Sequence, residues 1–426
     1  MSTQASTALE VLERQLTQPL VASLEVCARC GICAESCHYF LSEPRLENVP
    51  AARGEALRRV YRAEKDWLSR ILPGWTGAEK LTEEGLARLA EMAFTRCTLC
   101  RRCTFNCPMG VDTPLLMRAV RAMATASGAA PEILVMLADV AIEKGKNPEF
   151  FRDIFLSQMA DLEKVLQEKV GDTRARITVE REGAQVLYVG LSGTHTILPP
   201  AILFHTAKED WTLSIFEASN YGVFLSDTGR AKQITARIVE EAKRLHVKEV
   251  VLAECGHAYA AMRWDAPNWF GEPFPFRVTS LVEKIDEYLA AGRLRLNPRA
   301  NSETVTYHDS CNMARNGGVI EEPRRILRAA AAKFVEMTPN RTEAYCCGGG
   351  GGLVAQPDYA ELRLQAGKPK ADQIRRTGAQ VVVAACENCR LQLGDLNTHY
   401  DLAVRISALA DLVVTALEPP LSQPLA

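Results

Sequence analysis

Residues 345–352 read YCCGGGGG, which places two adjacent thiols directly before five consecutive glycines. Glycine loses more conformational freedom on folding than any other residue, so such a run is costly unless the backbone must approach something closely. An anionic iron–sulfur cluster fits that need, because hydrogen bonds to its sulfurs, here from backbone N–H groups such as those of Gly348 and Gly349, help set its reduction potential. The alternative is a flexible glycine-rich loop beside two buried structural cysteines.

Three further cysteines flank this pair in the last third of the chain, namely Cys311, Cys386 and Cys389. Together with Cys346 and Cys347 they form a pattern that resembles the cysteine-rich CCG domain of the heterodisulfide reductase catalytic subunit and its relatives. The resemblance implies that the five cysteines hold a non-cubane [4Fe–4S] cluster that acts on disulfides. It is strongest toward peripheral iron–sulfur subunits of membrane redox complexes in sulfur and sulfate metabolism.

The composition excludes several classes of protein. The 50 basic residues nearly balance the 52 acidic ones and form no block, so nothing indicates a nucleic-acid partner. No long apolar run and no secretion signal occur, which predicts a cytoplasmic protein. Fourteen cysteines in that compartment indicate metal or redox chemistry rather than disulfides.

Two runs in the N-terminal third share the spacing C-x2-C-x2-C-x3-C, which is the bacterial two-cluster ferredoxin signature. In that signature three cysteines of one run and the fourth of the other complete each cluster. The first predicted cubane site is Cys27, Cys30, Cys33 and Cys107, and the second is Cys97, Cys100, Cys103 and Cys37. A zinc site would need only four thiolates, usually in paired C-x2-C knuckles.

The segments around these runs carry weaker signals. His38 stands where the second run has Pro108, and we expect it to be only a polar neighbour. The insertion at 44–93 has helical patterns with a basic face, which either docks an acidic electron donor or is simply solvated. Residues 1–23 have the pattern of an amphipathic helix, which either packs on its own domain or docks a partner.

The rest of the chain is predicted to be helical first and α/β afterwards. Helices are expected over 113–170, with a break near Gly145 and Pro148. Strands are then expected at 185–190 and 248–254 around a helix at 231–245, and again at 303–307 and 380–384 around a helix at 322–335. This order predicts parallel sheets and an internal repeat.

The repeat aligns Tyr307 with Tyr188 and Cys386 with Cys255. Ser192 and Ala258 then occupy the positions of Cys311 and Cys389, and Leu225 and Ser226 lie near those of Cys346 and Cys347. The first half has therefore lost its cluster site.

Cys255 is the one cysteine outside the three sets. We predict that it faces the five-cysteine cluster as a nucleophile toward a sulfur–sulfur bond, with His257 as proton carrier, because an imidazole beside a thiol can take and return its proton. His308, which nearly adjoins Cys311, could serve similarly. The alternative for Cys255 is a small buried core residue.

The predicted fold class is α/β plus α, with a ferredoxin-like two-cluster domain in a helical N-terminal region, followed by two pseudo-twofold α/β CCG domains of which the first is degenerate. The predicted domains are a helical arm at 1–23, a two-[4Fe–4S] domain with a helical insertion at 24–125, a helical connector at 126–182, the degenerate CCG domain at 183–300 and the CCG domain with the non-cubane cluster at 301–426.

Three clusters along one chain suggest an electron path. The resemblance implies a heterodisulfide reductase-like oxidoreductase subunit that acts on sulfur groups. It would lie on the inner face of the membrane through a membrane-embedded partner, a cytochrome b or a quinone-reactive subunit. A soluble redox protein or a thiol/disulfide substrate protein would be a further partner. The second hypothesis is a non-catalytic carrier between a flavoprotein or cytochrome and the quinone pool, similar to the iron–sulfur subunits of glycolate or lactate oxidation.

Overall fold

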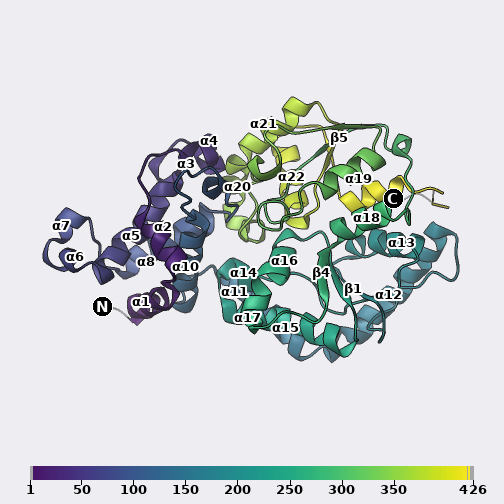
Figure 1. Cartoon of the computed structure of the whole chain (residues 1–426), viewed down its shortest axis with the longest axis horizontal. Coiled ribbons are helices and arrows are strands. Elements are labelled where there is room, and N and C mark those ends of the chain that lie inside the picture. The colour runs from purple at the N-terminus through teal and green to yellow at the C-terminus, as the bar shows by residue number, and fades with distance from the viewer. Residues whose placement is uncertain (1–2, 420, 423–426) are drawn as a thin grey trace. The chain divides into compact units, whose positions relative to one another are not determined.

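The computed structural model describes residues 3–419 and 421–422. The chain forms two compact units, coloured along the sequence in Figure 1. Unit 1 comprises 1–137, 221–227 and 345–372, and unit 2 comprises 138–220, 228–344 and 373–426. The first two residues of the predicted arm, and residues 420 and 423–426 of the predicted C-terminal domain, lie outside the described part of the chain.

Unit 1 is helical throughout its described residues. Its elements are α1 (Thr3–Gln15), α2 (Gln18–Glu25), α3 (Cys33–Ser36), α4 (His38–Ser42), η1 (Leu46–Asn48), α5 (Pro50–Lys65), α6 (Trp67–Ile71), α7 (Pro73–Thr76), α8 (Glu83–Thr95), α9 (Arg102–Phe105), α10 (Thr113–Ala126), the start of α11 (Glu132–Lys146), α14 (Gly222–Leu225), η6 (Leu353–Ala355), η7 (Pro357–Tyr359), α20 (Ala360–Ala366) and the start of α21 (Lys368–Thr377).

Helix α10 is the centre of unit 1, because α1, α2, α5 and α8 all pack on it. It begins as the sequence predicts: the Asp112 side chain accepts a hydrogen bond from the Leu115 N–H, and Pro114 lies in the first turn. Leu116, Met117 and Val120 are buried in the core that these helices share.

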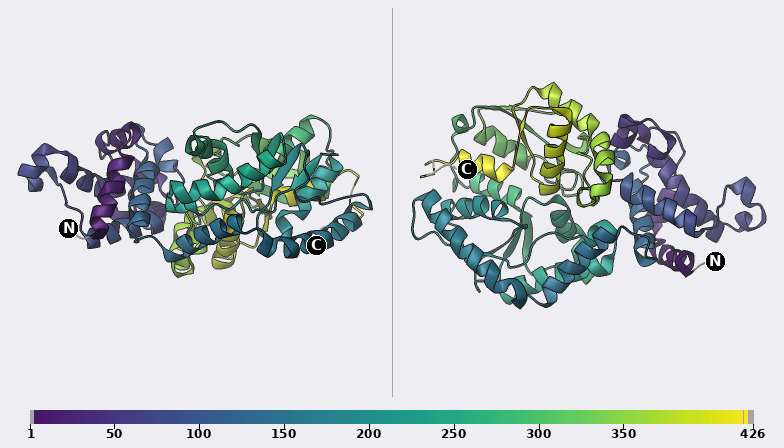
Figure 2. Two further views of the ribbon diagram at one scale, coloured as in Figure 1. Left: turned by 90° about the horizontal axis from the view of Figure 1, so that it is seen from below. Right: turned by 180° about the vertical axis from the view of Figure 1, so that it is seen from behind.

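The insertion between the two cysteine runs forms α5 to α8. Helices α5 and α8 pack in the core, whereas α6 and α7 stand away from the other helices of unit 1 in Figures 1 and 2. This hairpin is internally ordered: the Asp66 carboxylate caps α6 at Leu68, and Ser69 Oγ lies 2.9 Å from Thr76 Oγ1. It nevertheless exposes four large apolar side chains, Trp67, Ile71, Leu72 and Trp75, which are 50–79% accessible.

Unit 2 is built on two parallel sheets. Its elements are the end of α11, α12 (Glu149–Val170), β1 (Val186–Val189), η2 (Thr194–Thr196), α13 (Leu198–Thr206), β2 (Trp211–Leu213), α15 (Thr228–Arg244), β3 (Glu249–Leu252), α16 (Gly256–Ala260), η3 (Ala261–Asp265), α17 (Ala266–Phe270), β4 (Arg277–Ser280), α18 (Leu281–Ala290), η4 (Pro298–Ala300), β5 (Thr304–Tyr307), α19 (Glu322–Ala330), β6 (Lys333–Val335), η5 (Arg341–Glu343), the end of α21, β7 (Val381–Val383), α22 (Glu387–Tyr400), β8 (Arg405–Ser407) and α23 (Leu409–Thr415).

The two sheets have the same strand order, β2-β1-β3-β4 and β6-β5-β7-β8, and every pairing in them is parallel. Their central strands are fully buried, as expected for parallel sheets covered on both faces. In each sheet the chain order reverses between the two central strands, which is where open α/β sheets bind ligands at the carboxyl ends of the strands. The mixed helical and α/β fold class is therefore confirmed.

Several details differ from the sequence predictions. The helix predicted at 322–335 ends at Ala330, because Ala331 is extended and residues 333–335 form the edge strand β6. The registers also separate the two matches that define the repeat: Tyr188 pairs with Val251, whereas Tyr307 pairs with Val383. Cys255 thus lies one residue further from its sheet than Cys386 does, and the two matches need an offset of one residue between them.

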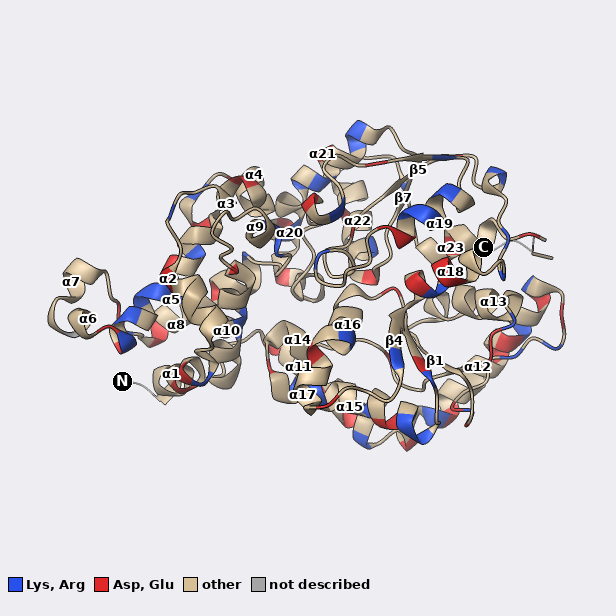
Figure 3. Ribbon diagram, viewed as in Figure 1, with Lys and Arg blue, Asp and Glu red and all other residues tan. Residues whose placement is uncertain are grey.

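Among the described residues no helix combines the length and the apolar character needed to cross a bilayer. Figure 3 shows basic and acidic residues interspersed along the helices of each unit, which agrees with the nearly balanced composition.

Candidate iron–sulfur centres

The four cysteines of the first predicted cubane site lie together in unit 1. Cys27, Cys30, Cys33 and Cys107 all line one small cavity, which Cys103 of the second run also touches. Burial raises the pKa of the Cys33 thiol, and the neighbouring thiolates of Cys27, Cys107 and Cys30 raise it further. Four thiols that destabilise one another's negative charge in this way suit a shared metal centre, which removes that repulsion.

The four cysteines of the second predicted site also gather in unit 1. Burial holds the pKa of the Cys103 thiol well above its ordinary value, and the thiolates of Cys100, Cys37 and Cys97 add to the shift. The fourth cysteine of the first run therefore lies with three cysteines of the second run. This proximity is the arrangement that crossed ligation requires.

Buried polar atoms without partners surround the second site. Among the described residues, His38 Nε2, the Tyr39 hydroxyl, and Nε and Nη1 of Arg53 are all buried and make no hydrogen bond. Buried donors of this kind are expensive unless an acceptor is present. An anionic [4Fe–4S] cluster would supply sulfur acceptors at this place, so the residues present fit such a group.

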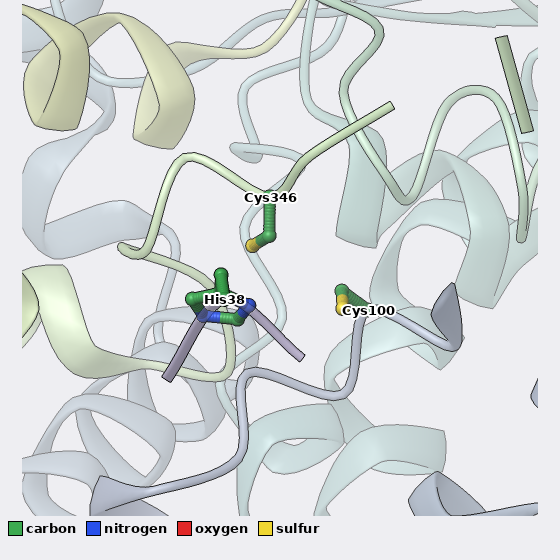
Figure 4. Close-up of side chains that lie close together, drawn as sticks. All are labelled: His38, Cys100 and Cys346. Carbon is green, nitrogen blue, oxygen red and sulfur yellow. The ribbon is translucent and has the colours of Figure 1, made fainter. Parts of the chain in front are cut away.

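The cysteine pair that opens the glycine run lies against the second site. Thr98, between Cys97 and Cys100, has its Oγ1 3.3 Å from Cys346 Sγ. His38, Cys100 and Cys346 bring their potential ligand atoms within 4.8 Å of one another, and Figure 4 shows their side chains converging from three separate segments. His38 is thus more than the polar neighbour that the sequence predicts.

The glycines after Cys347 are required by close backbone packing. At Gly348, which has a φ of +99°, a Cβ would lie 2.8 Å from the Arg363 carbonyl oxygen, and at Gly350 it would lie 3.1 Å from that of Thr98. The Gly348 N–H donates to Cys346 Sγ over 3.4 Å, while Gly349 is buried. Gly348 therefore shows the N–H-to-sulfur geometry expected from the sequence, and the run also lets this loop rest on the second cysteine run.

Arg121 ties the segments of unit 1 together. Its guanidinium is fully buried and donates to four backbone carbonyl groups, those of Ala93, Cys97, Phe224 and Gly351. Burial lowers the pKa of Arg121 to about 10, so the side chain stays charged at neutral pH. One side chain thereby fixes the loop of Cys97, the glycine run and the segment 221–227.

The remaining cysteines of the five-cysteine set lie in unit 2, at the carboxyl edge of the second sheet. Cys311 follows β5, and Cys386 and Cys389 follow β7, so they flank the point where the strand order reverses. The loop after β5 is anchored by Asp309, whose carboxylate binds the buried Arg324 through two hydrogen bonds of 2.8 Å. Cys346 and Cys347 belong to unit 1.

Cys386 is the most acidic thiol of this edge. It is the N-cap residue of α22, and hydrogen bonds from the Cys389 side chain and from the backbone N–H of Gly256 lower its pKa to about 7. A thiol at a helix N-terminus is readily ionised, and a thiolate is the form that ligates metal.

Cys255 lies beside Cys386, as the sequence predicts. The loop after β3 meets the loop after β7, since the Glu387 N–H donates to the Glu254 carbonyl over 2.8 Å. Gly256 permits this approach, because a Cβ there would lie 3.0 Å from that of Asn312, next to Cys311. The sequence did not single out Gly256, whose role depends on this packing.

Cys255 and His257 are in contact, but both are held in their neutral forms. Cys255 Sγ lies 3.4 Å from His257 Nδ1, while His257 Nε2 accepts a hydrogen bond from the Asn220 N–H. Burial raises the pKa of the Cys255 thiol, and nearby Cys386 raises it further; burial lowers the pKa of His257 to about 4. His308 is also buried, directly after β5, and its backbone N–H donates to Val383.

Two family models match the chain. Residues 305–394 match the cysteine-rich domain CCG, and residues 23–111 match the 4Fe–4S dicluster domain. The first range includes all five cysteines around the glycine run, and the second includes all eight of the ferredoxin-type runs.

The chain also has similar proteins among those of known role. It is 25% identical to the Hdr-like menaquinol oxidoreductase iron–sulfur subunit 2 of Archaeoglobus fulgidus, over 92% of this chain and 80% of that protein. It is 27% identical to the corresponding iron–sulfur subunit of Archaeoglobus profundus, over 92% and 79%. The dihydromethanophenazine:CoB–CoM heterodisulfide reductase of Methanosarcina barkeri contains one subunit that is 24% identical, over 95% and 96%. The chain is thus an iron–sulfur protein of the heterodisulfide reductase-like type with an electron-transfer role.

Proposed function

We propose that the chain is an oxidoreductase subunit in which electrons pass between two cubane sites and a non-cubane [4Fe–4S] site at Cys311, Cys346, Cys347, Cys386 and Cys389. When bound, the clusters supply the one-electron redox chemistry. The chain supplies their position. The substrate we propose is a disulfide or thiol, as the name of the Methanosarcina barkeri relative indicates for that protein.

The observation that carries this proposal is the contact between the second cubane site and Cys346. Thr98 and Cys100 of the second run both lie beside that thiol. The second cubane site is therefore the one adjacent to the five-cysteine site, and the first, at Cys27, Cys30, Cys33 and Cys107, is the outer one. Electrons then travel between the outer site and the five-cysteine site by way of the second.

A pseudo-twofold relation between the two sheets of unit 2 forms part of this proposal. The helix contacts support it: α13 packs on α23, and α19, the counterpart of α13, packs on α18, the counterpart of α23. Exchange of equivalent partners is what a two-fold axis requires. Cys255, the remnant of the degenerate half, then faces Cys386 across that axis.

A specific observation favours the second candidate, a non-catalytic carrier to the quinone pool. Cys255 and His257 are buried and neutral, whereas a thiol nucleophile works as a thiolate. The two Archaeoglobus relatives are described as subunits of menaquinol oxidoreductases. In this candidate the five-cysteine site only relays electrons.

We further propose that the subunit binds a membrane-embedded partner through the exposed surface of Trp67, Ile71, Leu72 and Trp75. Aromatic side chains that stand free on an ordered hairpin are typical of the central contacts of protein interfaces. This surface lies between the two cysteine runs in sequence and within unit 1, which contains both cubane sites. The partner would hold the protein peripherally on the cytoplasmic side of the membrane.

Spectroscopy of the anaerobically purified protein tests the proposal. We expect about twelve irons per chain, four for each cluster, and an electron paramagnetic resonance signal from the five-cysteine site that changes on addition of a thiol. A signal that ignores thiols, with the iron content intact, would favour the carrier. Substantial zinc with little iron would contradict both candidates.

A further inference from the structure

Arg53 is a charged side chain buried among thiols. It lies on α5, is 2% accessible, and its Nη2 donates to Cys37 Sγ over 3.1 Å. Its Nε and Nη1 are buried and make no hydrogen bond within the described part of the chain. A buried guanidinium with idle donors is costly unless a negative group lies next to it.

No carboxylate of the described residues forms an ion pair with Arg53, and the negative groups around it are cysteines. Burial alone lowers the pKa of the guanidinium, but the thiolates of Cys37, Cys97 and Cys103 outweigh this effect, so the pKa is raised. Arg58, one turn further along the same helix, differs in this respect. It is equally buried, but it binds the Glu55 carboxylate and the Leu24 carbonyl oxygen.

The first cubane site has no comparable cation among the described residues. The basic side chain near Cys27 is Arg29, which is 53% accessible and is paired with Glu55 at 3.0 Å. Its charge is therefore neutralised by the carboxylate and screened by water. The two sites thus differ in charge: one faces a buried and otherwise unpaired guanidinium, and the other faces only an exposed ion pair.

We propose that Arg53 tunes the second cubane site, donating hydrogen bonds to the sulfur atoms of the cluster held by Cys97, Cys100, Cys103 and Cys37. Reduction adds negative charge to such a cluster, and a nearby cation with N–H donors stabilises the reduced form. The second site therefore has the higher reduction potential of the two. This inference rests on the cubane assignment of the proposed function. An electron shared by the two sites resides mainly at the second, next to Cys346.

A potentiometric titration monitored by electron paramagnetic resonance tests this inference on the whole anaerobic protein. In Arg53→Gln, which keeps an N–H donor but removes the charge, we expect the ratio of reduced to oxidised second cluster at a fixed potential to fall about tenfold, which equals 59 mV for a one-electron couple. In Arg53→Lys, which keeps the charge, we expect a smaller shift. The potential of the first cluster should not change in either variant.

The matched control is Arg58→Gln, which removes an equally buried arginine from the same helix without touching the second site. Unchanged potentials in Arg53→Gln with full iron content would overturn the inference, as would equal shifts of both clusters in Arg53→Gln and Arg58→Gln. If Arg53→Gln loses only the second cluster while Arg53→Lys retains it, the charge requirement is supported; loss in both, and in Arg58→Gln, contradicts it. Wild-type protein without cubane signals would refute the proposed function itself.

Discussion

Arg121 donates a hydrogen bond of 2.8 Å to the carbonyl oxygen of Gly351, which lies 230 residues away in the sequence. The same Nη1 donates to Phe224, also over 2.8 Å, so one buried cation joins the two segments that return to unit 1 from later parts of the chain. These are the segments that the internal repeat aligns with each other. The equivalence of the two halves therefore has a structural counterpart inside unit 1.

Replacing Arg121 by Met should destabilise the protein by about 3–5 kcal/mol, because four buried carbonyl groups lose their donor together. The free energy of unfolding of unit 1 and the iron content measure this effect. Arg118→Met, on the same helix but only half-buried, should cost less than about 1 kcal/mol. Equal losses in the two variants would show that Arg121 has no special role.

Cys37→Ser should damage the cluster built mainly on Cys97, Cys100 and Cys103, since the Cys37 thiol lies with theirs. The signal of the site at Cys27, Cys30 and Cys33 should persist. Electron paramagnetic resonance with an iron count distinguishes the two sites. If the site at Cys27 is lost instead, each run closes its own cluster and crossed ligation is wrong.

Cys255→Ser separates the three roles that remain for this thiol. Iron content and viologen-linked reduction of a small disulfide are measured on one sample. Unchanged iron with lost turnover supports a role in chemistry, whereas loss of about four irons would make Cys255 a ligand. Unchanged turnover would assign it to the core, where it is 3% accessible. His257→Asn should match the first outcome if His257 handles the proton.

Glu241 makes the stability of unit 2 depend on pH. Burial raises the pKa of its carboxyl group to about 7, although Ser214 and the Ile215 N–H donate to it. Between about pH 4 and 7 the unfolded chain releases this proton and the folded chain keeps it, so stability falls as the pH rises through that window. Glu241→Gln should lack this term and gain about 3 kcal/mol relative to wild type between pH 4 and 8.

Denaturant unfolding of wild type and Glu241→Gln at several pH values provides the measurement. The two stability curves should diverge as the pH rises and become parallel above pH 8. Curves that are parallel from pH 4 upward would mean that the carboxyl group ionises normally in the folded protein.

The exposed hairpin predicts how the subunit is held. Trp67→Glu with Trp75→Glu should weaken association with the membrane partner at least tenfold, because interface tryptophans commonly contribute about 2 kcal/mol or more each. Co-purification from native membranes measures the loss, and cluster spectra should not change. Phe150→Glu, at another exposed aromatic position, is the control. Binding of wild type to protein-free anionic vesicles, equal to its binding to native membranes, would identify lipid as the ligand instead.

The sequence predicted the features that depend on local patterns. The cysteine spacings gave the three sets, and the apolar runs gave the four central strands β1, β3, β5 and β7. The edge strands were missed because segments as short as residues 333–335 carry too few residues for a period, and their pairing is non-local. The predicted helix continued through them for the same reason.

The charged residues that organise the sites were missed for a different reason. Arg53 and Arg121 lie in helices, where an isolated arginine has the pattern of a solvated face. Their burial follows from what packs above them, namely thiols in one case and carbonyl groups of remote loops in the other. His38 was misread similarly, because its nearness to Cys346 depends on a segment more than three hundred residues away.

The return of residues 345–372 to unit 1 also constrains the order of synthesis. The two ferredoxin-type runs leave the ribosome early, but the partner of Arg121 at Gly351 emerges only when more than four-fifths of the chain has been made. At translation rates of about 5–20 residues per second, the first eight thiols wait for more than ten seconds beside an unfinished core. Cluster insertion into this protein is thereby coupled to chain completion, so a truncated transcript releases a product that cannot close around its iron.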